Sequence, residues 1–186
     1  MTEHRSDQED RVPREGKYAR IERERRFLLA GAPPPSSVTV TRWITDRYLE
    51  GTRLRLRRAE CADGGGVLFK LTQKVPADRP GAVQGLITNT YLSEAEYALL
   101  ASLPAMVLSK TRLSVPPLGV DVFGTPLDGL VLAEAEFADD ESARLFVPPP
   151  LCRAEVTDDA RFTGGRLAVA DRACLLNWLA EYGIHP

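Results

Sequence analysis

Hydrophobic and polar residues alternate along several stretches of this chain, and charge gathers on one side of each stretch. In the segment 21–28, Glu22, Glu24 and Arg26 fall on every second residue. Side chains of a β-strand alternate between its two faces, so these three groups would project to the same side. A charge-rich strand is often only a solvated sheet edge. The alternation therefore predicts a strand whose charged face is either solvated or functional.

The same alternation recurs along much of the chain and predicts a mainly β protein. Each of these stretches sets an apolar or small face against a charged one. The basic faces carry Arg53, Arg55 and Arg57 in 49–58, Lys70 and Lys74 in 67–75, and Lys110 and Arg112 in 108–113. The acidic faces carry Asp121 in 119–123, Glu134 and Glu136 in 130–137, and Glu155 in 153–157. Two further β-like runs cover 38–44 and 86–92.

Helical patterns are inserted between these strands. Ser93 and Glu96 have the spacing of a capping box and predict a helix over 95–103. A short helix is predicted over 139–146, and apolar residues at helical spacing predict a C-terminal helix over 167–182. The fold class is therefore α+β, mainly antiparallel β.

Two architectures account for the charged strand faces. An antiparallel sheet with one solvated face would show the same alternation. Rows of like charge on one strand face repel each other, however, unless an anion lies across them. A closed barrel with a wet, charged lumen accommodates all the strands, with the inserted helices covering the apolar faces. Such a lumen would hold a polyanion through its cations, and its carboxylates suit Mg²⁺ or Mn²⁺.

Composition places this chain among single-domain proteins. Its 186 residues, 44% of them hydrophobic, suffice for one sizeable core. Residues 1–17 are almost wholly polar or charged, which predicts a flexible tail before a single domain over 18–186. We find neither the ~20 apolar residues of a membrane span nor a signal peptide, so we expect a cytoplasmic protein without a membrane partner. The net charge of -2 gives no general signal for nucleic acid.

Histidine and cysteine usage narrows the chemistry. The two histidines, His4 and His185, lie at the chain ends, which argues against a Ser-His-Asp device or an imidazole metal site. The 3 cysteines show no C-x-x-C spacing, which argues against a zinc site and a disulfide framework. Any chemistry must therefore use carboxylates, cations and a metal.

Six short motifs follow one another along residues 18–168. They are Glu-Arg-Glu-Arg-Arg at 22–26, Arg-Leu-Arg-Leu-Arg at 53–57, Thr-Gln-Lys at 72–74, Lys-Thr-Arg at 110–112, Asp-Val-Phe-Gly at 121–124 and Ala-Glu-Ala-Glu-Phe at 133–137. In this order they resemble the CYTH family, the triphosphate tunnel metalloenzymes, whose hallmark is an N-terminal E-x-E-x-K strand. Arg26 stands here in the place of the lysine. The resemblance implies an eight-stranded closed antiparallel β-barrel, a tunnel, with helices packed on its outside.

The resemblance also implies an activity and a set of site residues. We expect a divalent-metal-dependent phosphohydrolase that acts on inorganic triphosphate or an organic triphosphate, by charge neutralisation and in-line positioning. Catalytic roles fall to Glu22, Glu24, Glu134 and Glu136, and metal binding to the same four and Asp121. Phosphate binding falls to Arg26, Arg53, Arg55, Arg57, Lys70, Lys74, Lys110, Arg112 and Arg166. For Asp121 and Arg57, a role as salt-bridge partners in the lumen wall stays open.

Two departures from the family pattern bear on turnover. Many members carry an R-x-E-x-E strand where this chain has Thr88-Asn89-Thr90. No lysine follows Lys110, so Arg161 or Arg166 would have to serve where some members use a late lysine. These departures keep two alternatives open: a non-catalytic polyphosphate- or nucleotide-binding sensor of the same fold, and a class IV-like adenylate cyclase.

Overall fold

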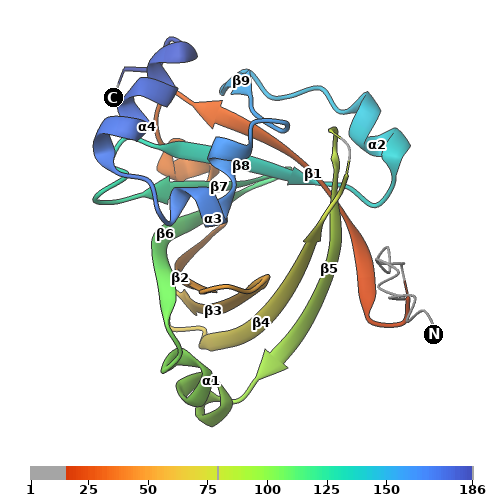
Figure 1. Cartoon of the computed structure of the whole chain (residues 1–186). Coiled ribbons are helices and arrows are strands. Elements are labelled where there is room, and N and C mark those ends of the chain that lie inside the picture. The colour runs from red at the N-terminus through yellow and green to blue at the C-terminus, as the bar shows by residue number, and fades with distance from the viewer. Residues whose placement is uncertain (1–15, 79, 186) are drawn as a thin grey trace, which may run out of the picture.

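The strands form one antiparallel sheet that curls round on itself in the computed structural model (Figure 1), which describes residues 16–78 and 80–185. Within these residues the sheet has nine strands in the order β5-β4-β3-β2-β6-β7-β8-β1-β9, and β1 also pairs with β5. This extra pairing closes β1 to β8 into an eight-stranded barrel, so the predicted architecture is confirmed. The strands are β1 Ala19–Leu29, β2 Val40–Leu49, β3 Leu54–Cys61, β4 Val67–Pro76, β5 Val83–Leu92, β6 Ala105–Val115, β7 Leu118–Phe123, β8 Val131–Glu136 and β9 Cys152–Glu155.

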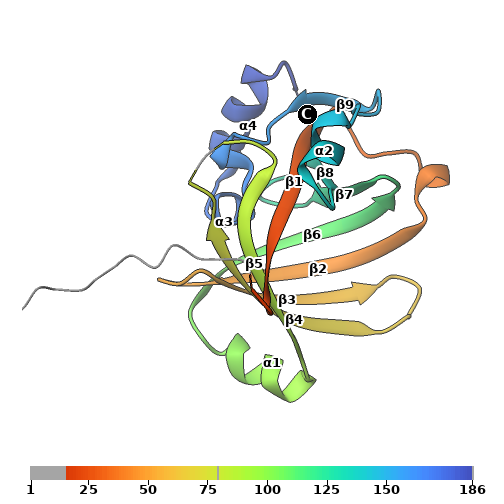
Figure 2. The ribbon, with the colours of Figure 1, turned by 90° about the vertical axis from the view of Figure 1, so that its right-hand side faces the viewer.

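The barrel closes at β1, which lies between β5 and β8 in Figure 2. Its first half pairs with β5, from Ala19 opposite Thr88, and the register shifts between Glu22 and Arg23. Its second half pairs with β8 along one edge. Along the other edge, beyond β5, it pairs with the short strand β9. β9 is therefore an addition to the edge of β1, and the eight-stranded barrel closes without it.

Helices α1 (Glu94–Ala101) and α2 (Asp140–Leu145) pack on the outside of the barrel. The capping box before α1 is confirmed, because the Ser93 hydroxyl accepts from the backbone N–H of Glu96 while the Glu96 carboxylate accepts from the N–H of Ser93. The Phe69 ring on β4 lies against Tyr97, with the two ring centroids 4.6 Å apart. This contact fixes α1 on the outer faces of β3 to β5.

The predicted single helix over 167–182 is wrong. The structure has a short α3 (Gly164–Leu167) and a separate α4 (Arg172–Glu181). The break has a local cause: the Asp171 side chain accepts a hydrogen bond from the backbone N–H of Cys174 and so caps a new helix. The periodic apolar residues bridge two helices that pack on the same core.

Two hydrophobic cores lie on opposite sides of β1. Phe27 and Leu29 belong to an outer core that includes buried side chains of β7 and β8 and packs against Phe146 after α2. Leu28 points the other way and joins an inner core with Phe162 and side chains of α3 and α4. The inward face of β1 is therefore polar along its first part and apolar at its end, where the C-terminal helices cover the barrel.

Three further features do not depend on the barrel: the N-terminal segment, the cysteines and the length of the helices. The predicted flexible tail over 1–17 lies outside the described residues, apart from its last two positions. Cys61, Cys152 and Cys174 are free thiols. Over residues 16–78 and 80–185, none of the helices has the length and apolar character that crossing a membrane requires.

Candidate functional site

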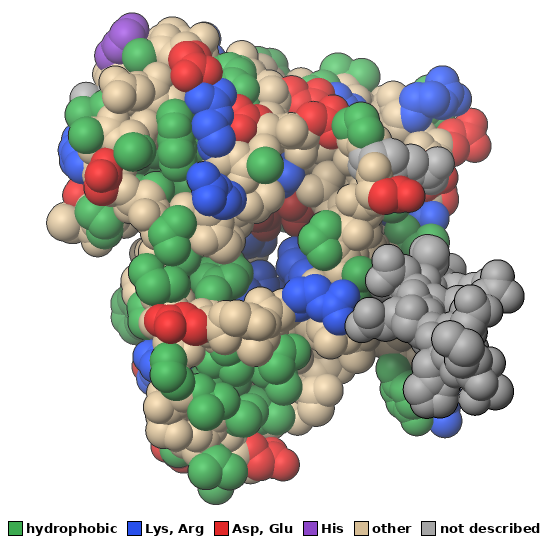
Figure 3. All heavy atoms as spheres, in the orientation of Figure 1, with side chains coloured by type: hydrophobic (Ala, Val, Ile, Leu, Met, Phe, Trp, Pro, Cys, Tyr) green, Lys and Arg blue, Asp and Glu red, His purple; other side chains and the backbone are tan. Residues whose placement is uncertain are grey.

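The inward faces of the strands enclose a cavity of about 1010 Å³. In the orientation of Figure 3 it is a hollow in the front face, with basic side chains inside it. Side chains of both charges line it, as the alternation along the strands predicts. The lining includes eleven of the predicted site residues: Glu22, Glu24, Arg26, Arg55, Arg57, Lys70, Lys74, Lys110, Arg112, Glu134 and Glu136.

Three predicted site residues do not line this cavity. Arg53 is exposed in the turn before β3, and Arg166 is exposed on α3. Asp121 has no exposed surface and lies beneath the lining. Arg161, the other candidate for the position of a late lysine, is bound by Glu181 at the end of α4. The structure therefore brings neither of the two late arginines to the cavity.

Most of the lining cations lie on other strands than the lining glutamates. The lining cations come mainly from β3, β4 and β6, whereas the lining glutamates come from β1 and β8. These two strands are neighbours, with Glu24 opposite Glu136 and Arg26 opposite Glu134 in the register. The glutamates therefore form one patch on β1 and β8. The cations of β3, β4 and β6 lie on other walls, while Arg20, Arg23 and Arg26 line the cavity from β1 itself.

Glu155, predicted on an acidic inner face, is instead outside the cavity. Its carboxylate accepts two hydrogen bonds from Arg25, at 2.8 Å from Nε and 2.6 Å from Nη2. Arg25 points outward from β1 and also donates to two backbone carbonyls of the α2 region. The expectation was wrong because β9 adds to the edge of β1 and does not contribute a wall to the barrel.

Asp121 on β7 anchors two cations of the β6 wall. Its carboxylate accepts hydrogen bonds from Lys110 Nζ and from Arg112 Nε and Nη2. These contacts occupy both oxygens of a side chain with no exposed surface. Asp121 is thus a salt-bridge partner in the lumen wall, the alternative that the sequence left open, and it offers no free oxygen to a metal.

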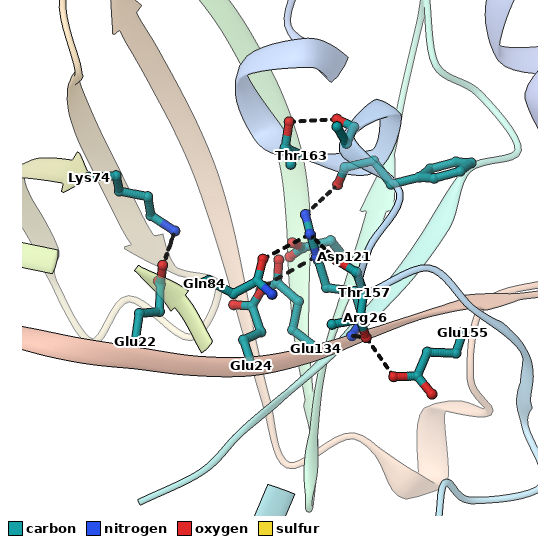
Figure 4. A network of polar contacts seen from close by, with 12 residues as sticks. Glu22, Glu24, Arg26, Lys74, Gln84, Asp121, Glu134, Glu155, Thr157 and Thr163 are labelled. Carbon is teal, nitrogen blue, oxygen red and sulfur yellow. Dashed lines mark hydrogen bonds and ion pairs between the residues drawn. The ribbon is translucent and has the colours of Figure 1, made fainter. Parts of the chain in front are cut away.

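Arg26 fixes the chain behind the cavity. Its Nη2 donates to the Thr157 carbonyl at 2.6 Å and to the Gln84 side chain at 2.9 Å, and its Nη1 donates to the Phe162 carbonyl at 3.3 Å. Figure 4 shows these contacts converging on its guanidinium. Three of the N–H donors with which Arg26 could bind a phosphate are therefore already used within the protein. Through them, Arg26 joins β1 to the segment that leads into α3.

Two of the acids pair with lining cations two strands away in the sheet. Glu22 accepts from Lys74 Nζ at 2.8 and 2.9 Å, which links β1 to β4 (Figure 4). Glu134 accepts from Arg112, the cation that Asp121 also holds. Burial alone would raise the pKa of Glu134, but the positive charges of Arg112 and Lys110 hold it well below its ordinary value. Glu134 is therefore an anion throughout the physiological range.

Glu24 differs from these two acids because it lacks a close cation. The nearest ion pair, to Arg26 Nε, is long at 3.6 Å. Burial, followed by the negative charge of Glu134, raises the pKa of Glu24 to about 8. A buried carboxyl group beside a carboxylate is stabilised as an anion when a cation joins the pair.

The acids on β1 and β8 are the residues that could hold a metal. Among the described residues, no three carboxylate, thiol or imidazole groups converge closely enough to form a complete protein cage. Mg²⁺ does not require one, because it usually takes one or two carboxylates and completes its shell with water and phosphate oxygens. Glu24 with Glu134 fits that requirement, since a cation between them would relieve the repulsion that raises the Glu24 pKa.

Sequence reasoning missed Asp46 on β2, the buried acid of the opposite wall. Its two oxygens accept from Arg57 Nε and Nη2 at 2.6 and 2.7 Å. The predicted strand stopped at Ile44, whereas β2 continues to Leu49. Extending the alternation by one step would have placed Asp46 on the inward face.

Comparisons with known proteins support the fold. No protein-family model matches the chain. A curated protein of Nitrosomonas europaea named inorganic triphosphatase is 41% identical over 51 residues, which are 27% of this chain and 34% of that protein, so the match spans about a third of the relative's length.

Two solved structures resemble this one along most of the chain. A crystal structure of the hypothetical protein NE1496 has a TM-score of 0.52 at 25% identity and covers 81% of this chain and 99% of its own. A crystal structure of the inorganic triphosphatase NE1496 has a TM-score of 0.51 at 24% identity, with 80% and 95% covered. The chain thus shares its barrel with these proteins.

Proposed function

We propose that this protein is a divalent-metal-dependent phosphohydrolase of the CYTH type that acts on inorganic triphosphate or an organic triphosphate. One observation carries the proposal: a single cavity sets a wall of anchored cations opposite a patch of glutamates. The order of the six sequence motifs and the similarity to a protein named inorganic triphosphatase support it. The proposed substrate is a small triphosphate or polyphosphate, since cations and acids in one closed barrel suit a compact polyanion with a metal.

In this proposal the lining cations bind the phosphates and the glutamates bind the metal ion. Lys110 and Arg112, held from below by Asp121, would bind phosphate oxygens in a fixed position. Lys74 would exchange its contact with Glu22 for a phosphate. Glu22, Glu24, Glu134 and Glu136 would hold the divalent ion and orient the attacking water. A bound Mg²⁺ or Mn²⁺ would supply charge neutralisation and a more acidic water.

A substrate and metal panel tests this function. Purified protein is incubated with tripolyphosphate, ATP and thiamine triphosphate, each with Mg²⁺, with Mn²⁺ and with a chelator, and phosphate, pyrophosphate and cyclic AMP are measured. We expect phosphate release from at least one triphosphate, lost in the chelator. Tight binding without product under every metal would contradict the enzyme and favour the non-catalytic sensor. The β5 wall, which includes Asn89 and contributes no carboxylate to the lining, is compatible with such a sensor. Cyclic AMP as the main product would favour the cyclase.

The pH dependence of binding gives a second prediction. In chelator, tripolyphosphate binding is expected to weaken as the pH rises through about 8, because burial and the charges of Arg57 and Arg55 lower the pKa of Lys70 to about 8. Lys70 is a cation below that pH and neutral above it, so its attraction for phosphate is lost on the alkaline side. Glu24 gains its negative charge over the same range, since its pKa is also about 8, which adds to the loss.

Calorimetric titrations near pH 7 and near pH 9 separate these two contributions. The Lys70→Gln variant lacks the contribution of Lys70 and keeps those of Glu24 and of the ionisation of tripolyphosphate itself, so its dissociation constant is expected to rise less between the two pH values than that of the wild type. An equal change in both proteins would mean that Lys70 does not contact the phosphate chain.

A further inference from the structure

We infer that Asp46 is a positioning residue that fixes the Arg57 and Arg55 guanidinium groups in the orientation that selects a phosphate chain over other anions. This inference rests on the proposed function for the identity of its anion. Asp46 itself touches no substrate, because it has no exposed surface. Its effect must therefore pass through the arginines that it holds.

The contact between Asp46 and Arg57 fixes the plane of the guanidinium. Oδ1 accepts from Nε at 2.6 Å and Oδ2 from Nη2 at 2.7 Å, so both carboxylate oxygens bind one edge of the group. Such a two-point contact sets orientation as well as distance. It uses two of the five N–H groups, and none of the described residues accepts from the other three, while Arg57 lines the cavity.

Arg55 is held more loosely by the same aspartate. Its Nε lies 3.7 Å from Asp46 Oδ1 and is buried without a hydrogen-bond partner. Its Nη2 reaches only the Thr72 hydroxyl, at 3.4 Å. Asp46 is therefore the carboxylate around which both arginines gather, and Arg55 keeps an unused donor.

This wall carries more positive charge than Asp46 neutralises. Arg55, Arg57 and Lys70 come from adjacent strands, with Arg57 directly opposite Lys70 in the register. Burial would raise the pKa of Asp46, but the hydrogen bonds and charge of Arg57 hold it at about 2, so it remains an anion. One anion among three cations leaves a surplus that an incoming anion can satisfy, and the rigid Arg57 edge determines which anion fits.

Charge and geometry make different predictions for this wall. If Asp46 only supplied charge, removing it would strengthen the binding of every anion alike. If it positions the arginines, its loss lowers the preference for phosphate over an anion of similar charge but different shape. The ratio of dissociation constants for citrate and tripolyphosphate, measured in chelator, separates the two.

The experiment compares the wild type with Asp46→Asn and Asp46→Glu by calorimetry. Asp46→Asn removes the charge, whereas Asp46→Glu keeps it and displaces the carboxylate by one methylene. Hydrogen bonds to charged groups are worth enough that we expect each variant to lower the citrate-to-tripolyphosphate ratio about tenfold. In an Arg57→Gln background, Asp46→Asn is expected to lower the ratio much less, because only its long contact with Arg55 remains to be lost.

The outcomes are distinct. The inference is overturned if the citrate-to-tripolyphosphate ratio is unchanged in the Asp46 variants. It is also overturned if Asp46→Asn lowers this ratio equally in the wild type and in the Arg57→Gln background. If Asp46→Asn does not fold, as judged by circular dichroism, Asp46→Glu carries the test. Binding in chelator can be measured without turnover, so this test is independent of the proposed activity. If the wild type hydrolyses no triphosphate but binds tripolyphosphate selectively, and the Asp46 variants lose that selectivity, the proposed activity is contradicted and the inference is supported. A wild type without preference for tripolyphosphate in chelator contradicts the inference, whereas the proposed activity is decided by phosphate release in the substrate and metal panel.

Discussion

Replacing Glu24 by glutamine is expected to lower triphosphate turnover about 100-fold or more. Glutamine keeps the shape of the side chain but cannot become an anion. Glu24 is buried, and its pKa of about 8 reflects burial and the neighbouring Glu134 with too little positive charge nearby. In the proposed site a metal ion supplies that charge, so the variant loses a ligand and, among ion pairs, only the long contact with Arg26. Phosphate release under saturating Mg²⁺ measures the effect.

The Glu24→Gln variant is expected to lose turnover but not stability. The pKa of Glu24 is raised in the folded state, so the wild type loses stability as the pH rises from the ordinary glutamate value of 4.5 to about 8. Glu24→Gln lacks this loss and is expected to be at least as stable as the wild type above pH ~8. Glu60→Gln, on a half-buried pair with Arg58 outside the cavity lining, is the matched control. Turnover close to that of the wild type in Glu24→Gln would remove Glu24 from the site.

Replacing Asp121 by asparagine is expected to cost about 3–5 kcal/mol of the free energy of unfolding. The change leaves Lys110 and Arg112 without their shared counterion in a wall where their side chains are only 7% and 17% exposed. Glu134 still contacts Arg112 and offsets part of the loss. Urea denaturation followed by circular dichroism measures the difference.

A surface ion pair gives the control for this prediction. Asp140 pairs with Arg23 but its side chain is 70% exposed, so Asp140→Asn should change the free energy of unfolding by less than about 1 kcal/mol. If Asp121→Asn also changes stability by less than about 1 kcal/mol, Asp121 is not the anchor of the cation wall.

The sequence was sufficient to predict which side chains face the cavity on the long strands. On β8, Glu134 and Glu136 have the period of a strand, and both reach the lining. The rows of like charge also favoured a closed lumen over a solvated sheet, and the structure closes at β1. These predictions succeeded because a strand side chain has only two directions to choose from.

What the sequence did not disclose depends on contacts between distant segments. Arg26 has the right alternation for a phosphate clamp, but Thr157 and Phe162, more than a hundred positions away, take its donors. Glu155 alternates correctly on β9, yet that strand lies outside the barrel. Arg53 shares the spacing of Arg55 but falls in the turn before β3, where alternation no longer determines direction.

The double pairing of β1 has a consequence for synthesis on the ribosome. β1 is the first of the nine described strands to be made, yet its partners are β5 and β8, and β8 begins at Val131. At translation rates of about 5–20 residues per second, β1 would wait roughly 5 to 20 s for its second partner. An unpaired strand in a nascent chain is an aggregation hazard, and charged side chains are what suppress it. The alternating charges of Glu22 to Arg26 would thus protect the growing chain before the cavity to which they contribute exists.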